Sequence, residues 1–202
     1  MHISDGILSA KICAAGYAGA ALVTGYALKK IKNGDIPRVS VISAVFFISS
    51  LLHFRVGPSS VHLLLLGIVG ILLGPLSPLV FFTGLFFQFM MFSHGGITTL
   101  GINTVIFSIP SLLIYSGNKT IFKKTTHTVI RSVTSGVLTA TGIFFAAFCI
   151  LLIIYFSAKQ FIGIAFLFSA SHAVLAVFEG AITGLVINRI LKVKPELLAF
   201  LC

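Results

Sequence analysis

The amino-acid sequence predicts an all-α integral membrane protein of about seven transmembrane helices, with its amino terminus outside and its carboxyl terminus in the cytoplasm. The first observation is composition: 57% of the residues are hydrophobic and only 9% are charged, whereas a soluble domain carries about 25% charged residues. The second is charge placement. The net charge of +10 comes from Lys and Arg between long apolar segments, so it indicates membrane topology and no nucleic-acid partner.

A helix needs about 20 apolar residues to cross the bilayer. We expect seven spans, at residues 7–28, 39–54, 61–73, 79–92, 99–116, 129–156 and 161–191. The third and fourth are short and could form a hairpin that does not cross completely, so the helix count around residues 60–92 stays open. A polar loop is expected at 117–128. The length favours one domain, residues 1–202.

The basic residues give the orientation. With the amino terminus outside, the inner side carries Lys29, Lys30, Lys32, Arg38, Lys119, Lys123, Lys124, Arg189, Lys192 and Lys194. The outer side carries only Arg55 and Lys159, with Lys11 one turn into the first span. This asymmetry predicts an odd number of spans in the inner (cytoplasmic) membrane of a cell. No basic stretch precedes the first apolar segment, so we expect no cleaved signal peptide.

The same topology brings four of the six histidines to the outer face, namely His2, His53, His62 and His94. His172 falls within the seventh span and His127 on the inner side. Imidazole is a good ligand for Zn, Cu, Fe and Ni. The alternative is that each histidine packs or hydrogen-bonds at the membrane interface. The three cysteines lie far apart without a CxxC pair, which argues against a thiolate site.

The first two residues form a potential chelator. Met1 offers its terminal amine, and His2 offers its backbone nitrogen and the imidazole nitrogen nearest the chain. Binding through all three closes a five-membered and a six-membered ring with little strain. The amide must lose its proton, and square-planar nitrogen ligation is typical of Cu(II) or Ni(II). A second histidine could fill the fourth corner. The alternative is an unordered terminus.

Four segments carry a resemblance to a known family. Residues 1–9, MHISDGILS, closely resemble the start of the cobalt/nickel substrate-capture subunits (CbiM/NikM family) of energy-coupling-factor transporters. Residues 58–64, PSSVHLL, and 94–103, HGGITTLGIN, are similar to two further motifs of that family. Ser171-His172 through Glu179-Gly180, with Thr183, resembles its last-helix pattern. The resemblance therefore touches most of the chain.

The resemblance implies a metal site and a set of partners. The Met1 amine, both His2 nitrogens and His62 would hold Ni²⁺ or Co²⁺, which is the transported substrate. A membrane coupling (T) subunit, cytoplasmic ATPase subunits and a small accessory membrane protein would complete the importer. The chain has no GxxxxGK[ST] loop, so it is not expected to bind ATP or to be an enzyme. The choice between cobalt and nickel stays open.

Four residues are candidates for lining the site, namely Asp5, Ser60, His94 and Asn103. Ser4 or Asp5 is expected to cap the first helix, although Asp5 could instead bond a ligand. His94 could line the site or brace a ligand through a hydrogen bond. Asn103 is expected to bond a loop or pack helices instead of binding the metal.

His172 and Glu179 are polar residues inside the seventh span, where an ionisable group indicates a function. They lie on one helix face about 10.5 Å apart, too far for one metal ion. We expect a structural or coupling role, with Arg131 or a hydroxyl as partner of Glu179.

Two other functions remain as alternatives. One is a stand-alone membrane metal carrier or sensor, which would need no ATPase partner. The other is an intramembrane hydrolase that uses Ser169 or Ser171 with His172, although neighbours on one helix are poorly placed as nucleophile and base.

Overall fold

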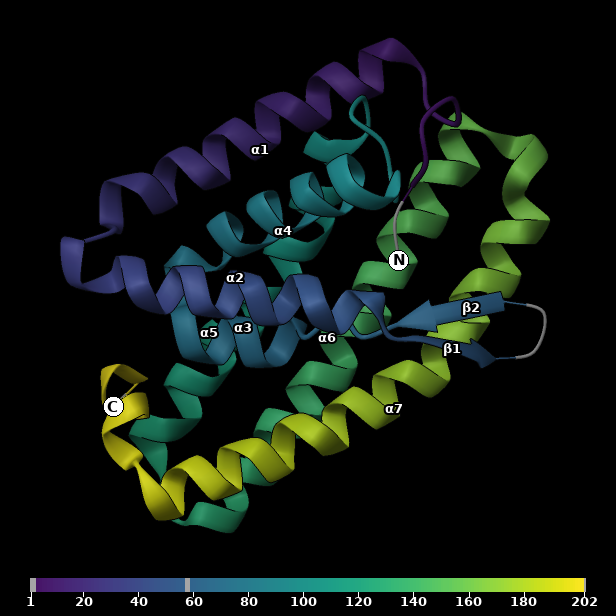
Figure 1. Cartoon of the computed structure of the whole chain (residues 1–202). Coiled ribbons are helices and arrows are strands. Elements are labelled where there is room, and N and C mark those ends of the chain that lie inside the picture. Colours follow the sequence, from purple (N-terminus) through teal and green to yellow (C-terminus); the bar gives the residue numbers. More distant parts are fainter. Residues whose placement is uncertain (1–2, 57–58, 202) are drawn as a thin grey trace.

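The computed structural model describes residues 3–56 and 59–201, and these residues are mainly helical (Figure 1). The α-helices are α1 (Ala10–Lys30), α2 (Ile36–Leu51), α3 (Leu66–Leu73), α4 (Ser77–Phe92), α5 (Leu100–Lys124), α6 (Thr128–Ser157) and α7 (Ile162–Val193). The strands are β1 (His53–Val56) and β2 (Ser59–His62), and the short 3-10 helices are η1 (Asn33–Asp35), η2 (Gly74–Leu76), η3 (Lys159–Phe161) and η4 (Pro195–Leu201).

Within the described ranges, five segments are long and apolar enough to cross a membrane, fewer than the seven spans expected. They are Asn33–Leu51, Leu66–Phe92, Leu100–Lys124, Thr128–Ser157 and Lys159–Val193. The expected third span is the shortest helix, because α3 has 8 residues and would extend only about 12 Å. Together with η2 and α4 it forms one candidate span, so residues 61–73 do not form a separate crossing.

A β-hairpin replaces the helix ends expected at residues 54 and 61. β1 pairs with β2 in antiparallel register, from His53 opposite His62 to Val56 opposite Ser59. The hairpin lies beside α7 (Figure 1), and β2 packs against that helix. The strands HFRV and SSVH are too short and too polar to show a hydropathy pattern, so the sequence offered no signal for the hairpin. The hairpin delivers His62 directly to the interior of the helix bundle.

Helix α5 continues to Lys124, so the polar loop expected at 117–128 is wrong over most of its length. The polar side chains in this stretch bond back to their own helix. Ser116 and Thr120 donate to the carbonyls four residues earlier, and Asn118 Nδ2 donates to Ile114 O at 2.8 Å. Such bonds let polar residues remain helical. By contrast, α6 and α7 begin and end within two residues of the predicted spans.

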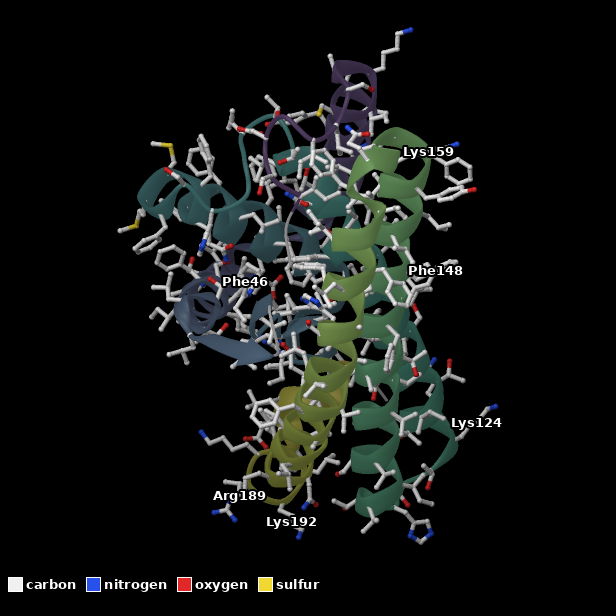
Figure 2. All side chains as sticks on the ribbon, turned by 90° about the vertical axis from the view of Figure 1, so that its right-hand side faces the viewer. Phe46, Lys124, Phe148, Lys159, Arg189 and Lys192 are labelled. Carbon is white, nitrogen blue, oxygen red and sulfur yellow. The ribbon has the colours of Figure 1, made fainter. Side chains whose placement is uncertain are left out.

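A cluster of aromatic rings joins α2, α4 and α5. Phe46, labelled in Figure 2, contacts Phe81 edge to face at a centroid distance of 5.3 Å, and Phe81 contacts Phe107 at 5.7 Å. All three side chains are fully buried. Edge-to-face pairs of this kind stabilise a core beyond the area they bury, so this cluster fixes the helices on which the amino-terminal segment rests.

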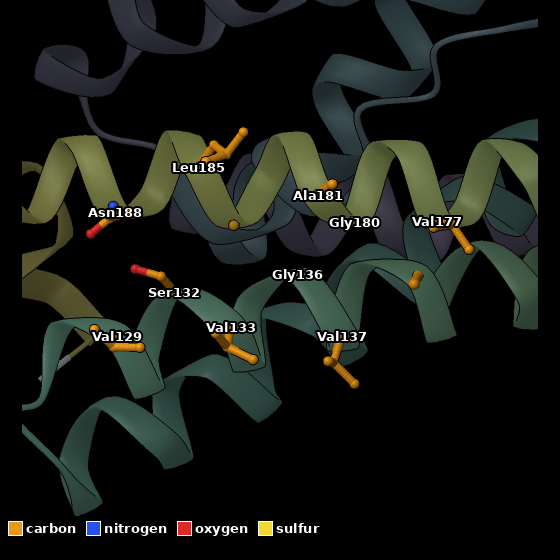
Figure 3. A pocket seen from close by; sticks show the side chains of 12 residues that line it. Val129, Ser132, Val133, Gly136, Val137, Val177, Gly180, Ala181, Leu185 and Asn188 are labelled. Atoms are coloured by element: carbon orange, nitrogen blue, oxygen red, sulfur yellow. The ribbon is translucent and has the colours of Figure 1, made fainter.

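Helices α6 and α7 form a closely packed antiparallel pair (Figures 1 and 3). A Cβ atom on Gly136 would lie 2.6 Å from Gly180 O, and one on Gly180 would lie 2.8 Å from Gly136 O. Only glycine permits this approach at these two positions. A groove of about 590 Å³ runs along the pair, with Ser132 and Asn188 at one end (Figure 3). The contact sets the position of α7 at the residue that follows Glu179.

Candidate metal centre

His62 is the expected metal ligand that the structure describes, and its tautomer is set by the backbone. The side chain is 4% exposed, and its Nδ1 lies 3.0 Å from Leu63 O. A carbonyl oxygen only accepts hydrogen bonds, so Nδ1 must carry the proton and Nε2 must carry the lone pair. A histidine that binds a metal typically donates its other ring N–H to a carbonyl in this way. His62 is therefore in the protonation state of an Nε2 ligand.

The segment after His62 is held by α7. The backbone N–H of Leu64 donates to Glu179 Oε1. Glu179 is 1% exposed, and its Oε2 has no hydrogen-bond partner among the described residues. The expected pairing with Arg131 is wrong, because Oε1 bonds Leu64 and Oε2 bonds no described residue. The Arg131 guanidinium donates to Phe122 O at 2.6 Å and to Thr125 O at 2.7 Å. The Glu179 carboxylate thus accepts a hydrogen bond from the loop that follows the candidate ligand His62.

His172 lies seven residues before Glu179 on α7 and is 1% exposed. Its Nδ1 is 2.7 Å from Phe168 O, so Nδ1 donates and Nε2 carries the lone pair. Nε2 has no partner within the described part of the chain. The Ser171 hydroxyl donates to Leu167 O at 3.0 Å. Because His172 Nε2 is unpartnered among the described residues, it does not act on Ser169 or Ser171 as the hydrolase alternative requires.

Ile3 begins the described chain and is clamped in the core. Its N–H donates to Asn103 Oδ1 at 2.9 Å, and its carbonyl accepts from Asn103 Nδ2 at 3.0 Å and from the Thr99 hydroxyl at 2.7 Å. The Ile3 side chain is 2% exposed. Asn103 thus bonds a chain segment, the kind of role expected for it. Met1 and His2, the other expected ligands, lie outside the described residues.

Asp5 forms a second anchor for the amino-terminal segment. Its carboxylate accepts from Ile97 N at 3.1 Å, from Thr98 N at 3.0 Å and from the Thr98 hydroxyl. The expectation that Ser4 or Asp5 caps the first helix is wrong, because α1 begins at Ala10 with Ser9 in the cap position. Asp5 instead satisfies the backbone of the loop between α4 and α5.

Two glycines make this anchor possible. A Cβ atom on Gly96 would lie 1.9 Å from Asp5 Oδ1, so the carboxylate can reach the loop only if residue 96 has no side chain. Gly6 has a φ of +82°, in the left-handed region that glycine adopts without strain. The turn at Gly6 redirects the chain between Asp5 and α1.

The remaining candidates lie around these anchors. His94 follows α4 and is half-buried, and its backbone N–H donates to Gln88 O at 3.3 Å. Ser60 lies in β2 with its backbone opposite Arg55. Across the described residues, no three His, Cys, Asp or Glu side chains gather as a metal-binding group. The proposed ligand set therefore depends on the terminal pair together with His62.

Sequence reasoning missed three of the groups that build this region. Thr98 and Thr99 were part of a recognised motif but received no role, although both hydroxyls bond the amino-terminal segment. The backbone N–H of Leu64 was also missed as the partner of Glu179. The two adjacent threonines directly before a helix could have indicated these bonds, because hydroxyls in that position commonly bond backbone groups.

A family model described as "Cobalt uptake substrate-specific transmembrane region" (CbiM) matches residues 2–197. The chain belongs to this family. The prediction of CbiM from the terminal and internal motifs is thereby confirmed. A cobalt transport protein CbiM of Propionibacterium freudenreichii is 31% identical over 229 residues, which cover 98% of this chain and 91% of that protein. A protein of Archaeoglobus fulgidus, provisionally named as a fused nickel transport protein NikMN, is 27% identical over 205 residues. These residues cover 98% of this chain and 68% of that protein.

A solved transition metal transporter has the same fold, with a TM-score of 0.82 at 23% identity over 99% of this chain and 97% of that chain. CbiM-type chains are components of cobalt and nickel transport. Together with the five apolar helical segments, this membership makes the chain a multi-pass membrane protein.

Proposed function

We propose that this chain is the substrate-capturing subunit of an energy-coupling-factor importer for cobalt or nickel. The ion is bound by the Met1 amine, by the backbone and side-chain nitrogens of His2, and by His62 Nε2. Four nitrogens in a plane suit Ni(II), and geometry must supply the selectivity because affinity alone would favour copper. The ion is the cargo, and the chain itself carries out no covalent chemistry on it.

The observation that supports this most strongly is the hydrogen bond between His62 Nδ1 and Leu63 O. It leaves the lone pair on Nε2, as metal binding requires, and it orients the ring. His62 is buried at the end of β2, a strand that pairs with β1 and packs against α7. A ligand held in place before binding costs less ordering entropy when the ion arrives.

The anchors at Ile3 and Asp5 support the use of the amino terminus. Three hydrogen bonds hold the Ile3 backbone and three more hold the Asp5 carboxylate. The chain that directly follows the proposed chelating pair is therefore fixed to α5 and to the loop before it. Hydrogen bonds to residues next to a metal ligand help to keep that ligand in binding geometry.

The distribution of basic residues supports the proposed orientation. Lys124, Arg189 and Lys192 lie at one end of the molecule, and Lys159 lies at the opposite end (Figure 2). By the positive-inside rule the first group faces the cytoplasm, which puts the amino-terminal region on the outer side of the inner membrane. Cytoplasmic ATPases would supply the energy through a membrane coupling subunit, since the sequence has no phosphate-binding loop of its own. A small accessory membrane protein would complete the importer.

Metal retention by His62→Ala tests the ligand assignment. Purified protein with an unblocked native terminus is loaded with Ni²⁺ or Co²⁺, desalted and assayed for bound metal. We expect the wild type to retain the ion in stoichiometric amount and His62→Ala to lose it. His127→Ala is the matched control, because His127 is an exposed residue before α6. Equal retention by His62→Ala and wild type would contradict the assignment.

Uptake into proteoliposomes tests the class of transporter. The chain is reconstituted alone or with its coupling subunit and ATPases, and metal entry is followed with and without ATP. We expect uptake only with the partners and ATP present. Uptake by the isolated chain would support the stand-alone carrier and contradict the proposed importer.

A further inference from the structure

The residue in α7 that contacts the ligand loop is Glu179, and we propose that it is the positioning residue that holds His62 in metal-binding geometry. This inference rests on the proposed function. Glu179 does not touch the ion in this account. It acts through the backbone N–H of Leu64, two residues after His62, which donates to Glu179 Oε1.

The loop between His62 and α3 has a conformation that its neighbours must maintain. Leu65 adopts the left-handed region, with φ 50° and ψ 25°. A non-glycine residue remains in that region only where the surrounding structure holds it. Leu64 and Leu66 are fully buried, so the polar backbone groups of this segment need partners inside the protein. Glu179 supplies the acceptor for the N–H of Leu64, which lies between the ligand and the strained residue.

Two further contacts fix the far side of the same loop. Ser111 of α5 donates to Leu66 O at 3.0 Å. A Cβ atom on Gly67 would lie 1.9 Å from Thr139 Oγ1, so the start of α3 is pressed against α6. The end of the segment is thus held by α5 and α6, whereas its beginning, next to His62, is held by Glu179 of α7. Loss of the Glu179 bond would free the part nearest the ligand.

Glu179 is itself fixed by its neighbour in sequence. Gly180 packs against the backbone of Gly136, and neither position has room for a side chain. This contact sets the height and rotation of α7 relative to α6, and so the place of the Glu179 carboxylate. Burying a carboxyl group within an apolar helix, as at the 1% exposed Glu179, costs folding free energy. We infer that this group is present because it positions the ligand loop.

The test compares Glu179→Gln with Glu179→Met in the full chain with a native terminus. Gln keeps an acceptor oxygen at nearly the same place, whereas Met keeps the volume but has no such acceptor. Ni²⁺ affinity is measured by calorimetry, and the coordination is followed by the visible spectrum of the Ni²⁺-loaded protein. His62→Ala, recorded in saturating Ni²⁺ without desalting, supplies the reference spectrum for a site without its fourth nitrogen.

We expect Glu179→Gln to keep the wild-type spectrum and affinity. Glu179→Met should shift the spectrum toward that of His62→Ala and weaken Ni²⁺ binding by about 10- to 100-fold, the usual cost of losing a group that orients a ligand. If Glu179→Met does not fold, Glu179→Asp replaces it in the test. The Asp carboxylate is one methylene too short to reach Leu64, so we expect the same shift of the spectrum.

Two results would overturn the inference. One is an unchanged spectrum and affinity in Glu179→Met or Glu179→Asp. The other is a Glu179→Gln variant that behaves like His62→Ala, because then an acceptor oxygen alone does not suffice. Failure of the proposed function is distinguishable, since in that case the wild-type protein itself would not bind Ni²⁺.

Discussion

The side-chain amide of Asn103 holds both backbone groups of Ile3, accepting from its N–H at 2.9 Å and donating to its carbonyl at 3.0 Å. Both residues are 2% exposed, so water cannot replace either bond. The third residue of the chain is thereby attached to the first turn of α5. In the proposed function this attachment determines where the chelating terminus begins.

Asn103→Ala should destabilise the protein and weaken metal binding. The substitution leaves the Ile3 N–H without a partner and takes one of the two bonds from the Ile3 carbonyl, and an unsatisfied buried group costs about 1–3 kcal/mol. We expect a lower unfolding midpoint in a thermal scan and reduced Ni²⁺ retention after desalting. Asn188→Ala is the control, because Asn188 is a half-exposed residue at the groove between α6 and α7. Matching behaviour of the two variants would refute the clamp.

Gly96→Ala should disrupt the anchor at Asp5. The added methyl group would lie 1.9 Å from Asp5 Oδ1, so the carboxylate must leave its bonds to Ile97 and Thr98. Crowding of this kind costs about 1–3 kcal/mol. We expect a lower unfolding midpoint and weaker Ni²⁺ binding by calorimetry. A Cβ atom on Gly34 meets nothing within 4 Å, so Gly34→Ala should have neither effect. An unaffected Gly96→Ala would count against a role for the anchor.

Gly180→Ala should separate α6 from α7. Its methyl group would lie 2.8 Å from Gly136 O, and backbone atoms cannot move aside as a flexible side chain can. We expect a loss of about 1–3 kcal/mol in stability and weaker metal binding through displacement of Glu179. Gly163→Ala in the same helix meets no atom within 4 Å and should leave both unchanged. The prediction fails if the two alanine variants have the same midpoint and affinity.

The proposed orientation predicts opposite labelling of two cysteine variants. Lys159 and Lys124 lie at opposite ends of the molecule (Figure 2). In a background without native cysteines, Lys159→Cys should react with an impermeant maleimide added outside intact cells, and Lys124→Cys should react only after the membrane is opened. The reverse pattern would place the amino terminus in the cytoplasm and would contradict the assignment from basic residues.

The sequence predicted α6 and α7 well because each is a long apolar run with charged residues at its ends. It failed where hydropathy has no preference between structures. Residues 53–56 and 59–62 adjoin two apolar runs that were expected to be helices, yet they pair with each other as antiparallel strands. Residues 117–124 look like a polar loop but stay helical, because hydroxyl and amide groups bond back to their own helix, as Asn118 does.

For the candidate site, the sequence identified the residues but not most of their partners. His62, Asp5, Asn103 and Glu179 were singled out from motifs and from polar residues in apolar surroundings. Glu179 bonds a backbone N–H 115 residues away in sequence, at Leu64. A backbone group has no sequence signature, so no pattern could predict that bond. The same limit applies to the Ile3 clamp, where the side chain was recognised and its backbone partner was not.

The proposed metal site depends on the free amine of Met1, and one comparison tests this dependence most directly. The protein is purified with Met1 as its first residue and, separately, with one alanine added before Met1, and the mass of each terminus is verified. Both forms are titrated with Ni²⁺ while the visible spectrum is recorded. We expect stoichiometric binding with a planar four-nitrogen spectrum only for the native form, because the added residue converts the terminal amine into an amide. The same spectrum and affinity in the extended form would contradict the proposed chelate.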